Sequence, residues 1–274
     1  MLTVIQFDQQ AIQTGTWRPE ELPKAYECFR GDGCLWLKGV FPTAYLNELR
    51  AIFLEEYKHV FDSGKESYSR ALVVGDKRLM IPVEIRGAFN NPALYANPLI
   101  CAFMKQALGD DFKLGGFGAV VSLPGALDQH IHSDHPALFG TMIDDFLPNF
   151  AVTMIVPLID SNEISGTTRV WKGSHFARYH AANSGTDFDK RDYQDPYAGV
   201  GDCLLMDYRL YHSGLANRSD KVRPILYITY FRPWFKDYVN YRNHPSLLFD
   251  EAEYEKAPPQ HRPLFSNAII RRKA

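Results

Sequence analysis

The sequence of 274 residues is 46% hydrophobic and 23% charged, with a formal net charge of −2. Charges of one sign form no long run, so the composition gives no electrostatic reason to bind nucleic acid or a membrane surface. Residues 1–8 contain no basic leader, the apolar stretch 151–159 is too short for a bilayer, and the cysteines form no CxxC pair; we therefore expect a cytoplasmic protein.

Helices are predicted for much of residues 1–110. Pro19 lies near the first turn of one helix, which ends at a pair of glycines, and residues 34–37 then form a short strand. A second helix starts at Pro42 and carries apolar residues at helical spacing. A third helix is expected over Pro92–Leu108 because a glycine follows directly.

From about residue 112 the pattern changes to short β-rich runs separated by Gly, Pro, Asn and Asp. The runs cover residues 113–122, 150–158, 167–170, 203–208 and 224–231. This pattern is typical of an antiparallel barrel or jelly roll. We expect a mainly β protein with flanking helices and a single catalytic domain over 1–274. Its parts are an N-terminal helical buttress (about 1–110), a jelly-roll core (about 111–235) and a helix and loop tail (236–274).

A candidate metal site combines His132 and Asp134 with the distant His212. Residues two apart on a strand point to the same face, so one strand end can present both His132 and Asp134 to one ion. His212 follows the strand-like run 203–206. Two imidazoles and one carboxylate on one face of a metal leave the opposite face open, which suits Fe(II). The alternative is a polar turn with surface histidines.

A second register is present in the same motif. His130 and His132 form an HxH pair, as in metal-binding cupins, but no Glu follows within a few residues. The sequence therefore favours the HxD register. We expect His130 on the same face, in a supporting position near the metal, and His135 pointing away.

Arg223 lies eleven residues after His212, beyond a segment rich in turn residues. A turn centred between Asn217 and Arg218 places positions 212 and 223 opposite each other on paired strands. Arg223 then faces the metal pocket and can grip a carboxylate with two hydrogen bonds. Arg218 and Lys221 are better candidates for solvated positions.

Three cations flank the apolar run 79–83, upstream of the predicted barrel: Lys77, Arg78 and Arg86. Their charges suit an anionic substrate. A solvated basic strand edge is the favoured interpretation, because such charges are most often exposed.

The chain resembles the phytanoyl-CoA dioxygenase-like family of Fe(II)/2-oxoglutarate-dependent oxygenases. Residues 129–134 are similar to its Q-x-x-H-x-D element, and residues 166–175 to its G-x-T-R-V-x-P-G-S-H element, with Lys172 in place of the usual proline. Residues 201–212, with Asn217 and Arg223, are similar to the final strand pair of the family. Residues 32–41 are similar to its opening strand. Four weak motifs in the family's order make the resemblance specific.

The resemblance implies a double-stranded β-helix with His132, Asp134 and His212 as iron ligands and Arg223 on the distal carboxylate of 2-oxoglutarate. Gln129 and Thr168 match positions that often contact this co-substrate; otherwise they are a structural amide and a strand hydroxyl. His175 belongs to a loop motif and is expected to be structural.

The implied reaction uses Fe(II), 2-oxoglutarate and O2 to oxidise a C–H bond, by hydroxylation, and releases succinate and CO2. Related halogenases carry a small residue where Asp134 stands, so the carboxylate favours oxygenation. We expect a small-molecule substrate of specialised metabolism, not an acyl-CoA, and no nucleic acid or membrane partner; the sequence predicts no oligomeric state. The alternatives are a cupin-type dioxygenase or isomerase without 2-oxoglutarate, which needs neither Arg223 nor Gln129, and a non-catalytic ligand-binding barrel.

Overall fold

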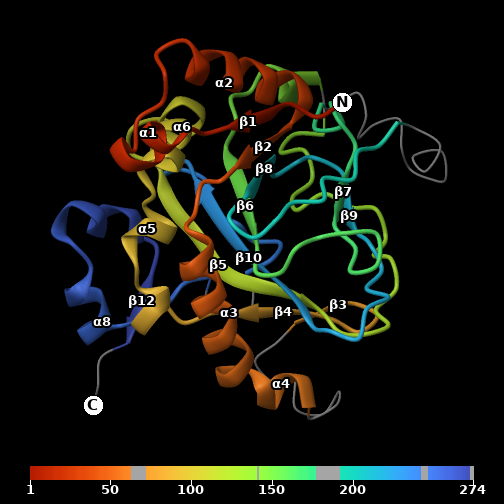
Figure 1. Ribbon diagram of the computed structural model, residues 1–274. Helices are drawn as coiled ribbons and strands as arrows, with labels where there is room; N and C mark the ends of the chain where they lie inside the picture. Colours follow the sequence, from red (N-terminus) through yellow and green to blue (C-terminus); the bar gives the residue numbers. More distant parts are fainter. Residues whose placement is uncertain (63–71, 141, 177–191, 242–245, 272–274) are drawn as a thin grey trace.

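A large sheet forms the centre of the protein in the computed structural model, which describes residues 1–62, 72–140, 142–176, 192–241 and 246–271 (Figure 1). Its eight strands run in the order β1-β2-β8-β6-β10-β5-β4-β3, and only β1 and β2 pair in parallel. They are β1 (Val4–Gln6), β2 (Cys34–Lys38), β3 (Leu72–Gly75), β4 (Arg78–Pro82), β5 (Lys113–Ser122), β6 (Ala151–Pro157), β8 (Cys203–Asp207) and β10 (Arg223–Phe231).

Two small sheets complete the β structure of the described residues. They pair β7 (Thr168–Val170) with β9 (His212–Gly214), antiparallel, and β11 (Leu248–Asp250) with β12 (Ile269–Arg271), in parallel. The α-helices are α1 (Gln9–Thr14), α2 (Glu21–Asp32), α3 (Thr43–Glu56), α4 (Lys58–Asp62), α5 (Pro92–Tyr95), α6 (Pro98–Leu108) and α8 (Glu251–Lys256). Short 3-10 helices cover Gly87–Phe89, Met142–Asp145 and Pro259–Phe265.

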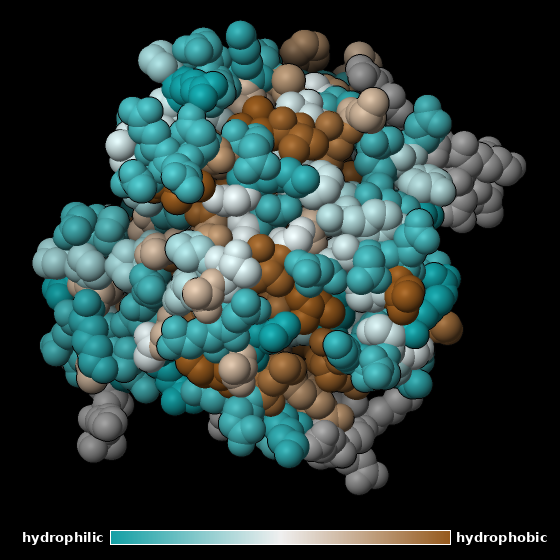
Figure 2. Space-filling model, in the orientation of Figure 1, coloured by the Kyte–Doolittle hydropathy of each residue, from teal (hydrophilic) through white to brown (hydrophobic). Residues whose placement is uncertain are grey.

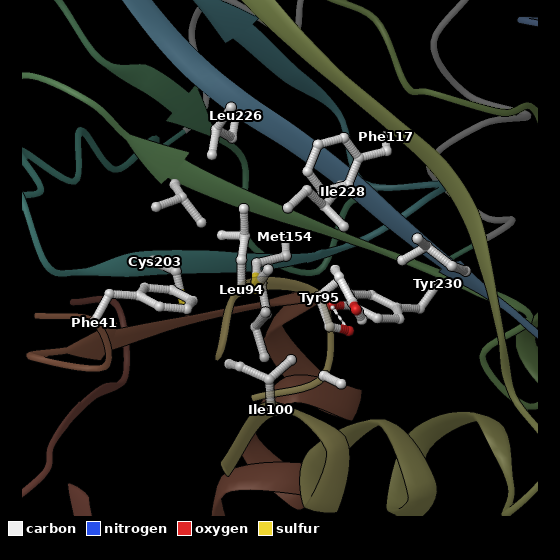
Figure 3. Packing of buried hydrophobic residues seen from close by; sticks show 14 of the residues in the cluster. Phe41, Leu94, Tyr95, Ile100, Phe117, Met154, Cys203, Leu226, Ile228 and Tyr230 are labelled. Carbon is white, nitrogen blue, oxygen red and sulfur yellow. Dashed lines mark hydrogen bonds between the residues drawn. The ribbon is translucent and has the colours of Figure 1, made fainter. Parts of the chain in front are cut away.

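Side chains alternate along the strands, so the large sheet contributes to two hydrophobic clusters. On β10, Leu226 and Ile228 join the cluster that is shared with helices α2, α3, α5 and α6 (Figure 3). Tyr227 faces the other way and joins a second cluster with Val170 of the small sheet. The large sheet is thus covered by helices on one face and by the β7–β9 sheet on the other, which is an open, cupin-like jelly roll and not a closed barrel.

The predicted strands of the second half of the chain match β5, β6, β7, β8 and β10 to within a residue or two. The prediction of one helix over Pro92–Leu108 is wrong, because the chain breaks into α5 and α6. Asn97 caps α6 through its side chain, which accepts from the backbone nitrogen of Leu99 at 3.0 Å. Pro98 follows directly and cannot donate to a continuing helix.

The N-terminal part is less helical than predicted. Residues 1–110 supply β1, β2, β3 and β4, which form half of the large sheet, whereas the sequence predicts a strand over residues 34–37 and favours a strand edge beside the run 79–83. The tail also contains the β11–β12 pair besides helix and loop. These strands are three to five residues long, too short to show a period of two clearly.

Within the described ranges, every helix is too short or too polar to cross a membrane. The face of the molecule in Figure 2 is mostly hydrophilic, and its apolar side chains form separate patches.

Candidate metal centre and active-site cavity

A backbone bridge brings His132 and His212 together from distant parts of the chain. The backbone nitrogen of His132 donates to the carbonyl of His212 at 3.0 Å, and the nitrogen of His212 donates back at 2.7 Å. The two imidazole rings consequently lie with their centroids 4.4 Å apart. The segment that ends at His132 extends the small sheet, because β9 is held between it and β7.

Asp134 completes a three-residue cluster. Its Oδ1 lies 3.5 Å from Nε2 of His212, and one ligand atom from each of His132, Asp134 and His212 lies within 4.8 Å of the others. No other group of three or more such donors occurs in the described ranges. The three side chains converge as expected, although Asp134 lies in a bend just beyond the bridge and not on a regular strand.

The backbone fixes the tautomer of both histidines. Nδ1 of His132 lies 2.8 Å from the carbonyl oxygen of His130, and Nδ1 of His212 lies 3.0 Å from that of Leu210. A carbonyl oxygen can only accept, so each Nδ1 must carry the proton. In a neutral ring with this tautomer Nε2 carries the lone pair, and Nε2 of His212 lies 3.5 Å from Oδ1 of Asp134. Imidazoles that bind metal ions are commonly oriented in this way.

The electrostatics of the cluster fit a bound cation. Burial, with a further contribution from His212, lowers the pKa of His132 to about 3, so its imidazole is neutral and can donate its lone pair. Burial raises the pKa of Asp134 above its usual range, and His212 and hydrogen bonds oppose this shift only in part. A positive charge at this place stabilises the ionised carboxylate, and two imidazoles with one carboxylate suit ferrous iron.

His130 and His135 lie where the motif predicted them. The ring of His130 is 5.0 Å from that of His132 and lies at the cavity, but it does not belong to the three-residue cluster. The ring of His135 packs against Phe150 and Phe235, away from the site.

The cluster opens into a cavity of about 350 Å³ between the large sheet and the small one. Apolar side chains from β3, β4, β5, β6 and β10 form much of its wall. The lining residues are Val73, Val74, Gly75, Arg78, Met80, Val120, Gln129, His130, His132, Ser133, Asp134, Ile155, Thr168, His212, Gly214, Arg223, Ile225, Tyr227 and Asn240.

Arg223 reaches this cavity by a different route from the predicted one. The prediction that His212 and Arg223 lie opposite each other on paired strands is wrong, because β9 pairs with β7, whereas β10 pairs with β5 and β6. The guanidinium of Arg223 enters from the large sheet. It is 3% exposed and donates to the carbonyl of Ser165 at 2.7 Å and to the hydroxyl of Ser122 at 2.8 Å.

The sequence offers Arg78 as a contact for an anionic substrate but favours a solvated strand edge for it. The interpretation as a solvated strand edge holds for Lys77 and Arg86, which are exposed, but it is wrong for Arg78, which is 1% exposed. Arg78 donates to the hydroxyl of Ser122 and to the carbonyls of residues 127, 214 and 215. Both Arg78 and Arg223 stand opposite Ser122 in the strand register, on the two sides of β5.

The two buried guanidinium groups favour the binding of an anion in the cavity. Burial lowers the pKa of Arg78 to about 10; burial, together with the charge of Arg78, lowers that of Arg223 to about 9. The charge of Asp128 opposes both of these pKa shifts only in part, and within the described part of the chain neither arginine forms a close ion pair with a carboxylate. Buried cations are normally paired, so a carboxylate of a ligand in the cavity is the expected partner.

Gln129 and Thr168 both line the cavity. The amide of Gln129 also has a structural task, since it donates to the carbonyl of Val74 at 2.8 Å and accepts from the nitrogen of Gly214 at 3.3 Å. His175, which was expected to be structural, lies within hydrogen-bonding distance of the carbonyl of Arg30, at 2.9 Å, and is absent from the cavity.

Tyr227 and Asn240 are lining residues that were not predicted. Tyr227 had a usable signal: Arg223, Ile225 and Tyr227 are spaced two apart on one strand and must share a face. Asn240 had none, because it lies in an irregular segment after β10.

Comparison with known proteins shows relatives over most of the chain. The family model described as phytanoyl-CoA dioxygenase (PhyH) matches residues 29–225. The dioxygenase FUM3 of Gibberella moniliformis is 24% identical over 221 residues, which are 76% of this chain and 71% of FUM3. The dioxygenase trt7 of Aspergillus terreus is 22% identical over 240 residues, covering 85% of this chain and 81% of trt7.

Solved structures share the fold. The non-heme alpha ketoglutarate dependent epimerase SnoN from nogalamycin biosynthesis superposes with a TM-score of 0.58 at 17% identity, covering 78% of this chain and 82% of SnoN. AviO1 from Streptomyces viridochromogenes Tue57 gives a TM-score of 0.61 at 19% identity, covering 81% of this chain and 99% of AviO1. At these identities the likeness establishes the jelly-roll architecture alone.

Proposed function

The chain belongs to the phytanoyl-CoA dioxygenase family, and we propose that His132, Asp134 and His212 are the ligands of its iron. The protein is a non-haem Fe(II)- and 2-oxoglutarate-dependent dioxygenase. The observation that carries the ligand proposal is the convergence of the three donor atoms within 4.8 Å, with both imidazoles held in the tautomer that leaves Nε2 unprotonated.

We further propose that Arg78 and Arg223 together bind the distal carboxylate of 2-oxoglutarate. Two guanidiniums that line the cavity without a carboxylate partner in the described residues supply both the charge and the donors for this group. Gln129 and Thr168 border the same space and are proposed to contact the co-substrate. A cupin-type enzyme without 2-oxoglutarate does not need the pair. A non-catalytic barrel is distinguished by metal analysis combined with an oxygen-consumption assay.

The residues of the chain then have separate tasks in the reaction. When bound, the ferrous ion activates O2 and supplies the oxidising power for the C–H bond. His132 and His212 hold the ion with fixed rings, and Asp134 offsets part of its charge. The arginines orient the co-substrate from the far end of the cavity. The apolar wall around Met80, Ile155 and Ile225 excludes water and so protects the oxidant from side reactions.

The lining of the cavity supports an uncharged and largely apolar substrate. Among the described lining residues, the side chains with a fixed charge are Arg78, Arg223 and Asp134, and the proposed ligands occupy all three. The remaining wall consists of apolar, amide, hydroxyl and imidazole groups, which offer no fixed positive charge for the phosphates of an acyl-CoA. Small molecules are also bound by proteins that share the fold, such as HygX in a structure with hygromycin B. We propose hydroxylation of a neutral specialised metabolite by a protein that works in the cytoplasm.

The function is tested by substrate-independent conversion of 2-oxoglutarate to succinate after reconstitution with Fe(II). His212→Ala and Asp134→Ala are expected to reduce the rate to background, whereas His59→Ala, at an exposed histidine, should retain it. Wild-type turnover in either cavity variant would remove that residue from the ligand set.

The substrate class is tested by a metabolite screen that pairs each carboxylic acid with its neutral methyl ester and measures stimulated succinate release. Neutral members should stimulate more strongly. A consistent preference for the charged members would exclude the proposed class.

A further inference from the structure

The two carboxylate oxygens of Asp134 face different partners. Oδ1 lies 3.5 Å from Nε2 of His212, on the side of the proposed metal. Oδ2 accepts a hydrogen bond of 3.0 Å from the hydroxyl of Thr153. One oxygen is therefore directed to the ion and the other is held by the protein.

Thr153 is placed for this contact by the large sheet. It lies on β6, directly opposite Thr229 of β10, and is fully buried. Its hydroxyl lies 3.4 Å from that of Tyr227. The neighbours Val152 and Met154 pack on the opposite face, among the helices. A buried hydroxyl in a β-strand that contacts a carboxylate from another segment has a specific task.

The backbone of Asp134 is held as well. The side-chain nitrogen of Asn240 donates to the carbonyl of Asp134 at 2.8 Å and to the carboxylate of Asp237 at 2.9 Å. Asp237 is in turn buried and accepts from the hydroxyl of Tyr208 at 2.6 Å. Both Asp237 and Asn240 lie beyond residue 225, where the match to the family model ends.

We propose that Thr153 is a positioning residue that reserves Oδ2 of Asp134, so that the carboxylate offers one oxygen to the metal, and that Asn240 fixes the backbone of the same residue. The inference rests on the proposed ligand set. A carboxylate that binds through one oxygen takes one coordination position, whereas a freely rotating carboxylate can take two. The hydrogen bond from Thr153 to Oδ2 thus keeps coordination positions of the metal available for the co-substrate and O2.

The experiment measures the affinity of the metal-free protein for Co(II), without turnover. Thr153→Val keeps the shape and β propensity of the side chain but removes the hydroxyl, and it should weaken Co(II) binding by roughly 10- to 100-fold, the usual cost of losing such a partner. Thr153→Ser restores a hydroxyl and should recover most of the affinity. Thr229→Val is the matched control, because it makes the same change at the paired, equally buried position, and its affinity should equal that of the wild type.

A second variant tests the hydrogen bond from Asn240, which lies outside the large sheet, to the backbone of Asp134. Asn240→Ala should weaken Co(II) binding severalfold while the melting temperature stays close to that of the wild type. Wild-type affinity in both Thr153→Val and Asn240→Ala would overturn the inference, and so would a loss in Thr229→Val equal to that in Thr153→Val. The ligand set fails separately: in that case Asp134→Ala would bind Co(II) as tightly as the wild type.

Discussion

Arg78 and Arg223 occupy the same register position on the two strands that flank β5, each directly opposite Ser122. This arrangement brings two positive charges to one hydroxyl in a nearly solvent-free place. Mutual repulsion and burial both make the pair costly in the absence of a ligand. If the proposed co-substrate carboxylate binds here, relief of that cost would contribute part of its binding energy.

Arg223→Gln should raise the KM for 2-oxoglutarate by about 10- to 100-fold, because a charge-assisted bond worth roughly 1.5–3 kcal/mol is lost. Arg78→Gln should act in the same direction. The measurement is the dependence of succinate formation on 2-oxoglutarate concentration, with Arg218→Gln as the control at an exposed arginine. An unchanged KM in both cavity variants would move the carboxylate site elsewhere.

Gly214→Ala should impair co-substrate binding with little effect on the metal. A Cβ at this position would lie 2.6 Å from Nη1 of Arg78 and 2.9 Å from Oε1 of Gln129, so the guanidinium must shift. We expect a raised KM for 2-oxoglutarate and wild-type affinity for Co(II). Gly31→Ala, in α2, is the control, because no atom lies within 4 Å of the added carbon; this variant should bind both ligands normally. Normal 2-oxoglutarate binding by Gly214→Ala would contradict the prediction and show that the cavity tolerates the shift of the guanidinium.

The buried ion pair of Asp207 and Arg209 makes the free energy of unfolding depend on pH in the acidic range. Burial alone raises the pKa of Asp207, but the charge and hydrogen bonds of Arg209 lower it well below the ordinary value of 3.8. The stabilisation is therefore complete above pH 3.8, the value expected for the unfolded chain, and is lost progressively as the pH falls below it. Urea unfolding between pH 7 and pH 3 measures this loss.

Asp207→Asn should remove that part of the pH dependence and lower stability at pH 7 by about 3–5 kcal/mol, because it removes the carboxylate that pairs with the buried Arg209 at 2.9 Å. Asp220→Asn, at an exposed aspartate, is the control. A pH profile that is identical in the wild type and Asp207→Asn would contradict the role of the pair.

Tyr230→Phe should destabilise the protein without changing its site. The hydroxyl of Tyr230 donates to the carbonyl of Tyr95 at 3.0 Å within the helix-facing cluster (Figure 3). Its loss leaves a buried carbonyl with one partner fewer, at a cost of about 1–3 kcal/mol. Denaturant unfolding should show the shift while succinate formation at moderate temperature stays at the wild-type rate; a rate that falls in proportion to stability would argue against separate roles for the two faces of the sheet.

The sequence predicted the long strands and the three proposed ligands, because both depend on local patterns. β5 and β10 are continuous runs of ten and nine mostly buried residues, and His132 and Asp134 are two residues apart. The short strand β3 escaped prediction because its pairing with β4, and not a local period, defines it. β4 was expected only as a strand edge, whereas it pairs with both β3 and β5.

The positions of Arg223 and Arg78 could not be predicted from the local sequence alone. Arg223 was predicted to face the pocket from a hairpin with His212, but the chain crosses from the small sheet to the large one between these residues. Arg78 is flanked by exposed Lys77, and nothing in the local sequence separates the two cations. Burial of Arg78 depends on Ser122 and on backbone carbonyls far along the chain.

The alternation of side chains along β10 also has a consequence for how this enzyme can diverge. Ile225 and Tyr227 border the cavity, whereas Leu226 and Ile228 belong to the helix-facing core. Mutations at every second position can therefore reshape what the enzyme accepts while the intervening positions preserve the framework. The residues that can change substrate selectivity and the residues that maintain the fold therefore lie on opposite faces of the same strand.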